Sequence, residues 1–309
     1  MLTVLETLLV AVLIAVDIVA SKWLGQQAYG WMPSQGTAEA KHVDDLFSFL
    51  VAVGAFIFLG IAAVIGYSIL FYRAPKGDFS HGHPARGSWK IEVLWTVVPI
   101  GLVLWIAIQS NTIYQQLNIQ GLTPIVMHMP MEEPAYAATV VSDAKPSTEN
   151  QAQPAAAQEI QVISKQWSWS FRYPGGVTST ELHLPVNRSI RLKLESLDVI
   201  HGFYVPEFRV KQDIIPNRTI TFTVTPARLG KYRLRDSSFS GPYLPLMEAD
   251  VYVEPLDAYN RWLAQAVTQT PTTARNPAFL EYTQQPQKAL GDGWPVVRPA
   301  PPPVVHHPS

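Results

Sequence analysis

The sequence predicts a membrane-anchored α + β protein, in which two or three N-terminal transmembrane helices precede a Greek-key β-barrel or β-sandwich. Three observations lead to this fold class. Hydrophobic residues make up 48% of the 309 residues and charged residues 15%, below the roughly 25% charged fraction of an average soluble domain. Long apolar segments lie near the N-terminus, and short runs with a period of two residues follow from residue 159.

The apolar segments are long enough to cross a bilayer. Residues 46–72 carry no charge over 27 residues, more than the ~20 that span a hydrocarbon layer of ~30 Å. Residues 91–110 form a second span, in which Glu92 is the only ionisable residue. Residues 1–20 contain two acidic residues and lack a basic start, so they are either a first transmembrane helix, which we favour, or a signal-like segment.

Charge predicts the orientation and excludes one class of partner. The loop 73–90 carries four basic residues and one acidic residue, which places it in the cytoplasm and the C-terminal part on the periplasmic or lumenal side of a cytoplasmic or thylakoid membrane. The chain has 23 basic and 24 acidic residues, so it has no basic excess for binding nucleic acid. It also has no cysteine, which excludes disulfides, thiolate metal sites and a cysteine nucleophile.

A β domain is predicted over residues 159–268. Apolar residues alternate with polar ones over 190–195 and 220–224, a pattern typical of strands with one buried face. Turn signals containing proline, glycine or asparagine separate the runs, as in sandwiches and barrels. Residues 256–267 have the pattern of an amphipathic helix that closes the domain.

Two segments have the composition of irregular chain. Residues 121–158 form a linker rich in proline, alanine, serine and glutamine, and residues 269–309 form a proline-rich tail that we expect to be disordered or to lie along the surface. The linker contains Met127, His128, Met129 and Met131. Thioethers and imidazole suit Cu(I), although apolar contact with the membrane or the domain is the favoured interpretation.

Four separated motifs resemble subunit II of the haem-copper respiratory oxidases, and the resemblance covers residues 40–265. The motifs are Glu92–Pro99, Lys165–Tyr173, Glu181–Pro185 and Asp198–Asp213. The resemblance implies a cupredoxin-like outer domain, partner subunits I and III, and haems with one copper in subunit I, where oxygen reduction and proton pumping occur. The region before residue 50 further resembles cyanobacterial members of the family.

The resemblance also implies the position of a metal site. In the cytochrome c oxidases of the family, a dinuclear copper centre takes a histidine from the motif at His201 and its other ligands from a Cys-x-Glu-x-Cys-x-x-x-His-x-x-Met run between the last two strands. Only His201 and Met247 have counterparts of the same type in this chain. The other aligned positions hold Asp236, Ser238, Ser240 and Leu244. We therefore expect no cofactor bound by this chain, with a lone copper at His201 and Met247 as the alternative.

This deficit favours quinol as the electron donor. A lipid-soluble quinol reaches the catalytic subunit from the membrane, and residues 237–242 resemble the copper-free loop of bo-type quinol oxidases. The predicted function is subunit II of a quinol:oxygen oxidase, itself not catalytic. Two alternatives stay open. One is a cytochrome c oxidase subunit with a rebuilt copper centre, and the other is a membrane-tethered copper-binding or chaperone module that uses His201 with Met127, His128, Met129 and Met131.

The remaining site residues follow from the resemblance, each with an alternative. Glu92 matches a glutamate at the cytoplasmic mouth of a proton path into subunit I. The alternative is that Glu92 is only a solvated residue at the end of a helix. Trp167 and Trp169 match aromatics near the cytochrome c docking surface, although packing in a core or at a subunit contact is favoured here. A cluster expected at the contact with subunit I, or else solvated on a loop, comprises Arg209, Lys211 and Asp213.

Overall fold

The computed structural model describes residues 4–71, 73, 77, 87–116, 158–284 and 297–307. They belong to two compact units. One unit comprises residues 1–118 together with 204–211, and the other comprises residues 119–203 and 212–309. The predicted linker 121–158 lies outside the described residues, apart from its last position.

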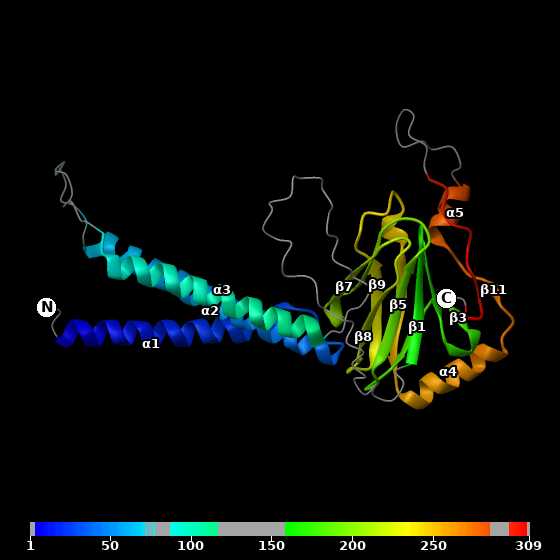
Figure 1. The fold of residues 1–309 in the computed structure, drawn as a ribbon, viewed down its shortest axis with the longest axis horizontal. Coiled ribbons are helices and arrows are strands. Elements are labelled where there is room, and N and C mark those ends of the chain that lie inside the picture. The colour runs from blue at the N-terminus through cyan, green and yellow to red at the C-terminus, as the bar shows by residue number, and fades with distance from the viewer. Residues whose placement is uncertain are drawn as a thin grey trace, which may run out of the picture. The chain divides into compact units, whose positions relative to one another are not determined.

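Three helices in the described part of the chain are long and apolar enough to cross a membrane. They are α1 (Val4–Gln27), α2 (Ala38–Phe71) and α3 (Trp89–Gln116). A 3-10 turn, η1 (Ala28–Trp31), joins α1 to α2, and these two helices run side by side as a hairpin (Figure 1). The expectation of two or three membrane helices is therefore met with three.

Small residues allow α1 and α2 to approach closely. A Cβ on Gly25 would lie 2.8 Å from both the Cβ of Ala52 and the carbonyl oxygen of Ser48, so the absent side chain is what makes room. The Ser48 hydroxyl donates to the Gly25 carbonyl at 2.7 Å, and the Ser21 hydroxyl donates to Asp17 at 3.2 Å. These polar contacts satisfy groups that lipid would leave without partners.

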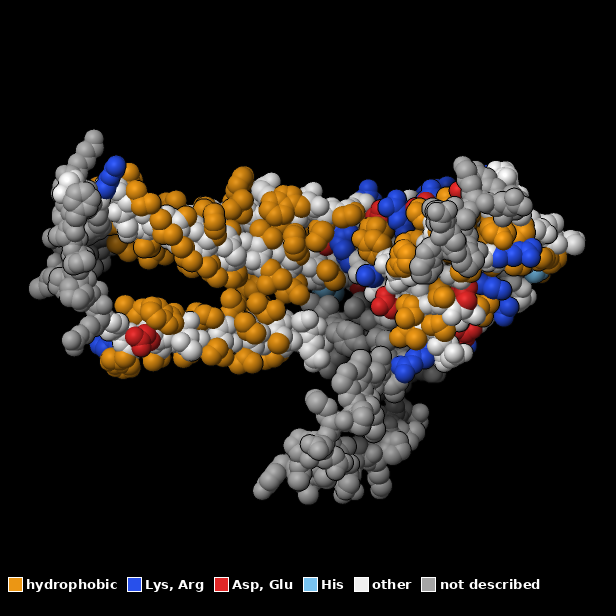
Figure 2. All heavy atoms as spheres, turned by 90° about the horizontal axis from the view of Figure 1, so that it is seen from above, with side chains coloured by type: hydrophobic (Ala, Val, Ile, Leu, Met, Phe, Trp, Pro, Cys, Tyr) orange, Lys and Arg blue, Asp and Glu red, His pale blue; other side chains and the backbone are white. Residues whose placement is uncertain are grey.

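Outside this contact, the helices present apolar side chains. Phe49 of α2 meets Trp105 of α3 with ring centroids 4.6 Å apart. Figure 2 shows hydrophobic side chains over the visible faces of the helices, whereas most of the charged side chains in that view belong to the β domain. Such surfaces are stable when covered by lipid or by another membrane subunit.

The β domain is a sandwich of two five-stranded sheets, ordered β3-β2-β1-β5-β8 and β4-β10-β9-β6-β7 (Figure 1). Most neighbouring strands are antiparallel, but β1 pairs in parallel with β5, and β10 with β4. The strands are β1 (Gln158–Lys165), β2 (Ser168–Arg172), β3 (Thr178–Ser179), β4 (Leu182–Pro185), β5 (Ile190–Ser196), β6 (His201–Val205), β7 (Val210–Ile214), β8 (Ile220–Val224), β9 (Gly230–Asp236) and β10 (Glu248–Glu254).

The period-two runs form the inner faces of this sandwich. Buried and partly exposed residues alternate along the whole of β5 and β8, and the ring centroids of Phe203 and Phe222 lie 5.7 Å apart in the core. Asn187 and Asn217 adopt φ values of 56° and 60°, which asparagine tolerates better than most residues. Both lie at turn signals seen in the sequence, so the predicted fold class is confirmed.

The C-terminal part is more ordered than its composition suggested. The predicted amphipathic helix is α4 (Leu256–Thr268). The proline-rich tail then contains β11 (Thr272–Thr273), α5 (Pro277–Gln284) and β12 (Val304–Val305). The Asn276 side chain accepts hydrogen bonds from the first backbone N–H groups of α5, so an N-cap starts a helix that the periodicity did not reveal.

Candidate functional site

The candidate site forms where two adjacent strands of the second sheet bring distant residues together. His201 begins β6 and Asp236 ends the neighbouring strand β9. The turn before β6 adds Asp198. Gly202 is required here, because a Cβ at this position would overlap the hydroxyl of Ser237. The loop after β9 therefore lies directly against β6.

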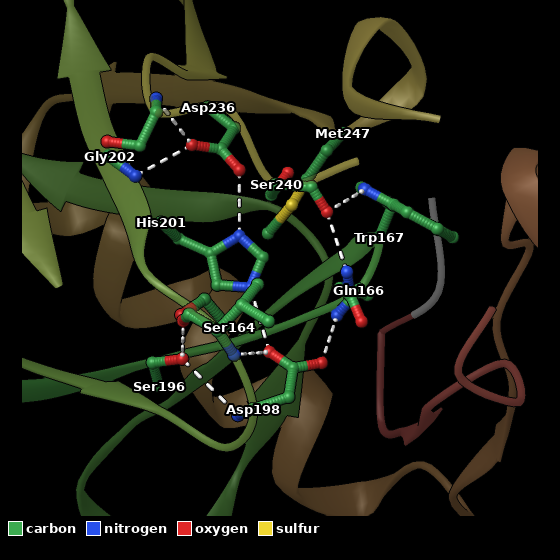
Figure 3. Close-up of polar contacts among 12 residues, drawn as sticks. Ser164, Gln166, Trp167, Ser196, Asp198, His201, Gly202, Asp236, Ser240 and Met247 are labelled. Atoms are coloured by element: carbon green, nitrogen blue, oxygen red, sulfur yellow. Dashed lines mark hydrogen bonds and ion pairs between the residues drawn. The ribbon is translucent and has the colours of Figure 1, made fainter. Parts of the chain in front are cut away.

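The imidazole of His201 lies between two carboxylates (Figure 3). Its Nδ1 is 2.7 Å from Asp236 Oδ2, and its Nε2 is 2.9 Å from Asp198 Oδ1. The side chains of His201 and Asp236 are fully buried, whereas that of Asp198 is 22% exposed. Both ring nitrogens are thus engaged by acceptors, which is the arrangement that suits a doubly protonated imidazolium.

Backbone N–H groups hold both carboxylates in place. Asp236 Oδ1 accepts hydrogen bonds from the N–H of Gly202 at 2.7 Å and of Ser238 at 3.0 Å. Asp198 accepts from the N–H of Gln166 and of Val199, at 2.8 and 2.7 Å. Hydrogen bonds to an ionised carboxylate favour its charged form.

The pKa values of all three residues are shifted in the direction that favours their charged forms, although burial opposes these shifts. Burial alone would lower the pKa of His201, but the two carboxylates outweigh it and raise that pKa above its ordinary value. Burial likewise acts to raise the pKa of Asp236 and Asp198, and is outweighed by His201 and the backbone N–H donors, so both pKa values are lowered. At a pH below the raised pKa of His201, the group is therefore an ion triad with one positive and two negative charges.

This triad predicts a pH window for stability. The two lowered aspartate pKa values add stability above the unfolded value of about 4, which is lost as the pH falls through the folded values. The raised pKa of His201 adds stability below about pH 6.5, which is lost as the pH rises through the folded value. We expect the stabilising contribution of the triad to be greatest between about pH 4 and pH 6.5.

Thermal midpoints of the full-length chain and of a His201→Gln variant, measured across this range, check the prediction. The difference between the two curves isolates the triad from the other ionisable groups. A difference that does not change with pH would contradict it.

Of the remaining positions aligned with the copper ligands, Ser238 contacts the triad through its backbone N–H, which donates to Asp236. Ser240 and Met247 are buried, whereas Ser238 and Leu244 are half-buried. Figure 3 shows Ser240 and Met247 beside Asp236 and His201. Among the described residues, no group of three or more histidine, aspartate and glutamate side chains is arranged to hold a metal ion.

Trp167 and Trp169 lie in the core of the β domain. They are 1% and 2% exposed. The indole N–H of Trp167 donates to the Ser240 carbonyl at 3.1 Å, and that of Trp169 donates to the Met247 carbonyl at 3.2 Å. Their role in this structure is to fix the backbone of the loop between β9 and β10.

Arg209 forms an ion pair within the helical unit. Its Nε and one terminal nitrogen bind the two carboxylate oxygens of Asp44, at 2.8 and 3.1 Å. The side chains are 7% and 2% exposed, so this bidentate pair is buried. Lys211 and Asp213 are exposed. The predicted contact of these residues with subunit I stays a prediction.

Glu92 lies in the first turn of α3, and its side chain is exposed. Its backbone N–H donates to the Ser88 carbonyl at 3.0 Å. The Thr96 hydroxyl, one turn further along, donates to the Glu92 carbonyl at 2.8 Å. The carboxyl group is thus carried at the start of a well-formed helix. The methionine-rich segment 127–131 lies outside the described residues.

Sequence reasoning missed two members of these ion pairs. Asp198 and Asp44 both lie within segments that carry the family resemblance, but neither was assigned a role. Asp198 precedes His201 by three residues, a spacing that a turn can close. Asp44 is 165 residues from Arg209, and no local pattern indicates that pairing.

Comparison with known proteins agrees with this architecture. Residues 21–113 match the family model of the cytochrome c oxidase subunit II transmembrane domain, and residues 177–248 match that of the periplasmic domain. A Synechocystis protein named cytochrome c oxidase subunit 2 is 30% identical over 275 residues, with 84% of this chain and 81% of that protein covered.

Other relatives carry different names. A Bacillus cereus protein named quinol oxidase subunit 2 is 23% identical over 244 residues, with 77% of this chain and 73% of that protein covered. The solved periplasmic domain of cytochrome oxidase subunit II from Bradyrhizobium japonicum is 29% identical and covers 36% of this chain and 94% of its own, with a TM-score of 0.34. The chain therefore belongs to the cytochrome c oxidase subunit II family and is the membrane-anchored subunit II of a haem-copper oxidase.

Proposed function

We propose that this chain is subunit II of a quinol:oxygen oxidase and carries no dinuclear copper centre. The observation that carries the proposal is the state of His201, the position that the resemblance assigns to a copper-ligating histidine. Both of its ring nitrogens are bonded to carboxylates. An imidazolium donating from both nitrogens has no lone pair to offer a metal ion.

The donor set around His201 does not fit a copper pair. Thiolates are the soft bridging ligands that such a pair needs, and the chain contains no cysteine. The carboxylate of Asp236, at the position aligned with the first cysteine, forms hydrogen bonds with His201 and two backbone N–H groups. The positive charge of His201 compensates the negative charge of Asp236, as a bound metal cation would.

Without an electron relay in the outer domain, the donor must reach subunit I by another route. A quinol dissolved in the membrane does so, and the name of the Bacillus cereus relative is consistent with that choice. In this proposal the chain anchors and shapes the complex, and its Glu92 delivers protons toward subunit I. Oxygen reduction takes place at the haems and the copper of subunit I.

Metal analysis of the purified complex and its choice of donor test the proposal. We expect one copper per complex, no paramagnetic signal of a mixed-valence copper pair, oxidation of quinol, and no oxidation of ferrocytochrome c. Three coppers per complex with rapid oxidation of ferrocytochrome c would contradict it. One additional labile copper would indicate a copper-binding module that uses His201 with the methionines of residues 127–131.

The second candidate is a cytochrome c oxidase subunit, which is the name of the Synechocystis relative. It requires two copper ions bound without thiolates, in a domain whose aligned positions offer one imidazole and one thioether. The metal analysis therefore distinguishes it from the first candidate directly.

A further inference from the structure

The C-terminal segment Val297–His307, here called the strap, is attached to one edge of the β domain. His307 forms a bridge with Ser179 of β3, and the N–H of His306 donates to the Thr178 carbonyl at 2.9 Å. The strap contains β12, which pairs in antiparallel register with β11 outside the strap. Four of its eleven residues are prolines, which lower the entropy lost when the segment becomes ordered.

A second attachment lies at the other end of the strap. The N–H of Ala300 donates to the Gln166 carbonyl at 2.6 Å, and the Asn276 side chain donates to the Ala300 carbonyl at 3.1 Å. Ala300 is 7% exposed and Val305 is 1% exposed. One end of the strap is thus fixed to the turn between β1 and β2, and the other end is fixed to β3, by backbone hydrogen bonds and buried side chains.

The strap covers residues that support the His201 triad. The Gln166 N–H holds Asp198, and the Gln166 side chain donates to the Ser240 carbonyl at 2.6 Å. A cavity of about 530 Å³ lies between Asp198 and residues 298–301 of the strap. Asp198 is the partly exposed member of the triad, so the strap stands over the open side of the cluster.

The strap also borders the buried tryptophans. Trp167 and Trp169 line a cavity of about 280 Å³ together with Asn276 and Pro303. Trp167 packs against Tyr243 on another side, with ring centroids 5.0 Å apart. Trp167 is therefore contacted directly by the loop between β9 and β10, and Pro303 of the strap borders the cavity on its other side.

We propose that the strap is a built-in cover, which shields the Gln166–Trp167 face from solvent and stands between the Asp198 side of the triad and soluble protein partners. The occupant of this face is the chain's own C-terminal segment. Any effect of the cover on electron donors is inferred from the proposed function. The position of the cover is inferred from these contacts alone.

Two adjacent residues of β12 provide a matched test in the purified complex. Val305 is 1% exposed and Val304 is 61% exposed, so Val305→Asp should release the strap and Val304→Asp should not. Hydroxyl-radical footprinting reads the exposure of Trp167, and Phe222, 3% exposed between the sheets, serves as the internal reference. A chain ending at residue 296 removes the strap altogether.

We expect oxidation of Trp167 to rise by about tenfold or more in Val305→Asp and in the shortened chain, because an aspartate cannot replace a buried valine. Oxidation of Phe222 should stay unchanged. Equal protection of Trp167 in all variants would overturn the proposal, as would an equal rise at Phe222, which would make the strap part of the global fold. Neither outcome depends on the copper content or on the electron donor. The cover can therefore be disproved while the proposed function stands, and the reverse.

Discussion

Replacing Asp236 by asparagine is expected to lower the free energy of unfolding of the β domain by about 3–5 kcal/mol, the range found when one partner of a buried ion pair is removed. Asparagine keeps the size of the side chain but not its charge. The His201 imidazolium would lose its 2.7 Å partner and keep only Asp198. Because the His201 and Asp236 side chains are fully buried, water cannot compensate the remaining charge.

Urea unfolding of the full-length chain in detergent, followed by the fluorescence of the buried tryptophans, measures this loss. Asp213→Asn is the matched control, because Asp213 is exposed and its one described side-chain contact is the Ser238 hydroxyl at 3.3 Å. We expect the control to change stability by no more than about 0.5 kcal/mol. Equal losses in the two variants would show that the triad contributes no more than a surface carboxylate.

The double variant Asp236→Asn with His201→Gln separates the charge pair from the rest of the site. Once His201 is neutral, the carboxylate of Asp236 has no cation to compensate, and its replacement should cost much less than in the presence of His201. Additive losses would mean that the two residues act independently, which is incompatible with the 2.7 Å contact between them.

The elements with a strong repeating pattern were predictable from the sequence. The alternation in β5 and β8 follows from one face of each strand meeting the core, and a period of two leaves little freedom for the register. The uncharged run predicted over 46–72 overlaps α2, which begins earlier, at Ala38, and ends at Phe71. Its first residues are polar, so hydropathy alone did not include them in the helix.

The pairings of the site were not predictable from local patterns. His201 and Asp236 are 35 residues apart in the sequence and meet because β6 and β9 are neighbours in one sheet. The resemblance placed both residues at the same site, but it described Asp236 as a lost ligand. In the structure Asp236 has a role of its own. A carboxylate beside a histidine forms an ion pair, whereas a thiolate at the same position would bind metal.

The attachment of the strap shows a similar limit. Composition marks residues 269–309 as unable to form a core of their own, which holds for the segment in isolation. Asn276 and Val305 instead complete the surface of a domain that is already folded. Whether a proline-rich segment has such a surface available is a property of the tertiary structure, and the sequence of the segment does not contain it.

Replacing Glu92 by glutamine is expected to lower oxygen consumption by the complex by about a hundredfold, the lower end of the range for loss of a proton-transferring group. The carboxyl group lies in the first turn of α3, on the cytoplasmic side by the charge of the neighbouring loop. The resemblance assigns this position to proton uptake. Glutamine keeps the shape and the hydrogen-bonding capacity of the side chain, but it cannot take up and release a proton.

Two variants distinguish proton delivery from helix stability. Glu92→Asp keeps a titratable carboxyl group and should recover most of the turnover. Thr96→Val removes the hydroxyl that donates to the Glu92 carbonyl, so it perturbs the same helical turn while the carboxyl group stays. If proton delivery limits the rate, turnover should follow the carboxyl group across these variants, with quinol binding unchanged in each. A loss in Thr96→Val equal to that in Glu92→Gln would assign the effect to the helix, because the only change common to both would be in its first turns.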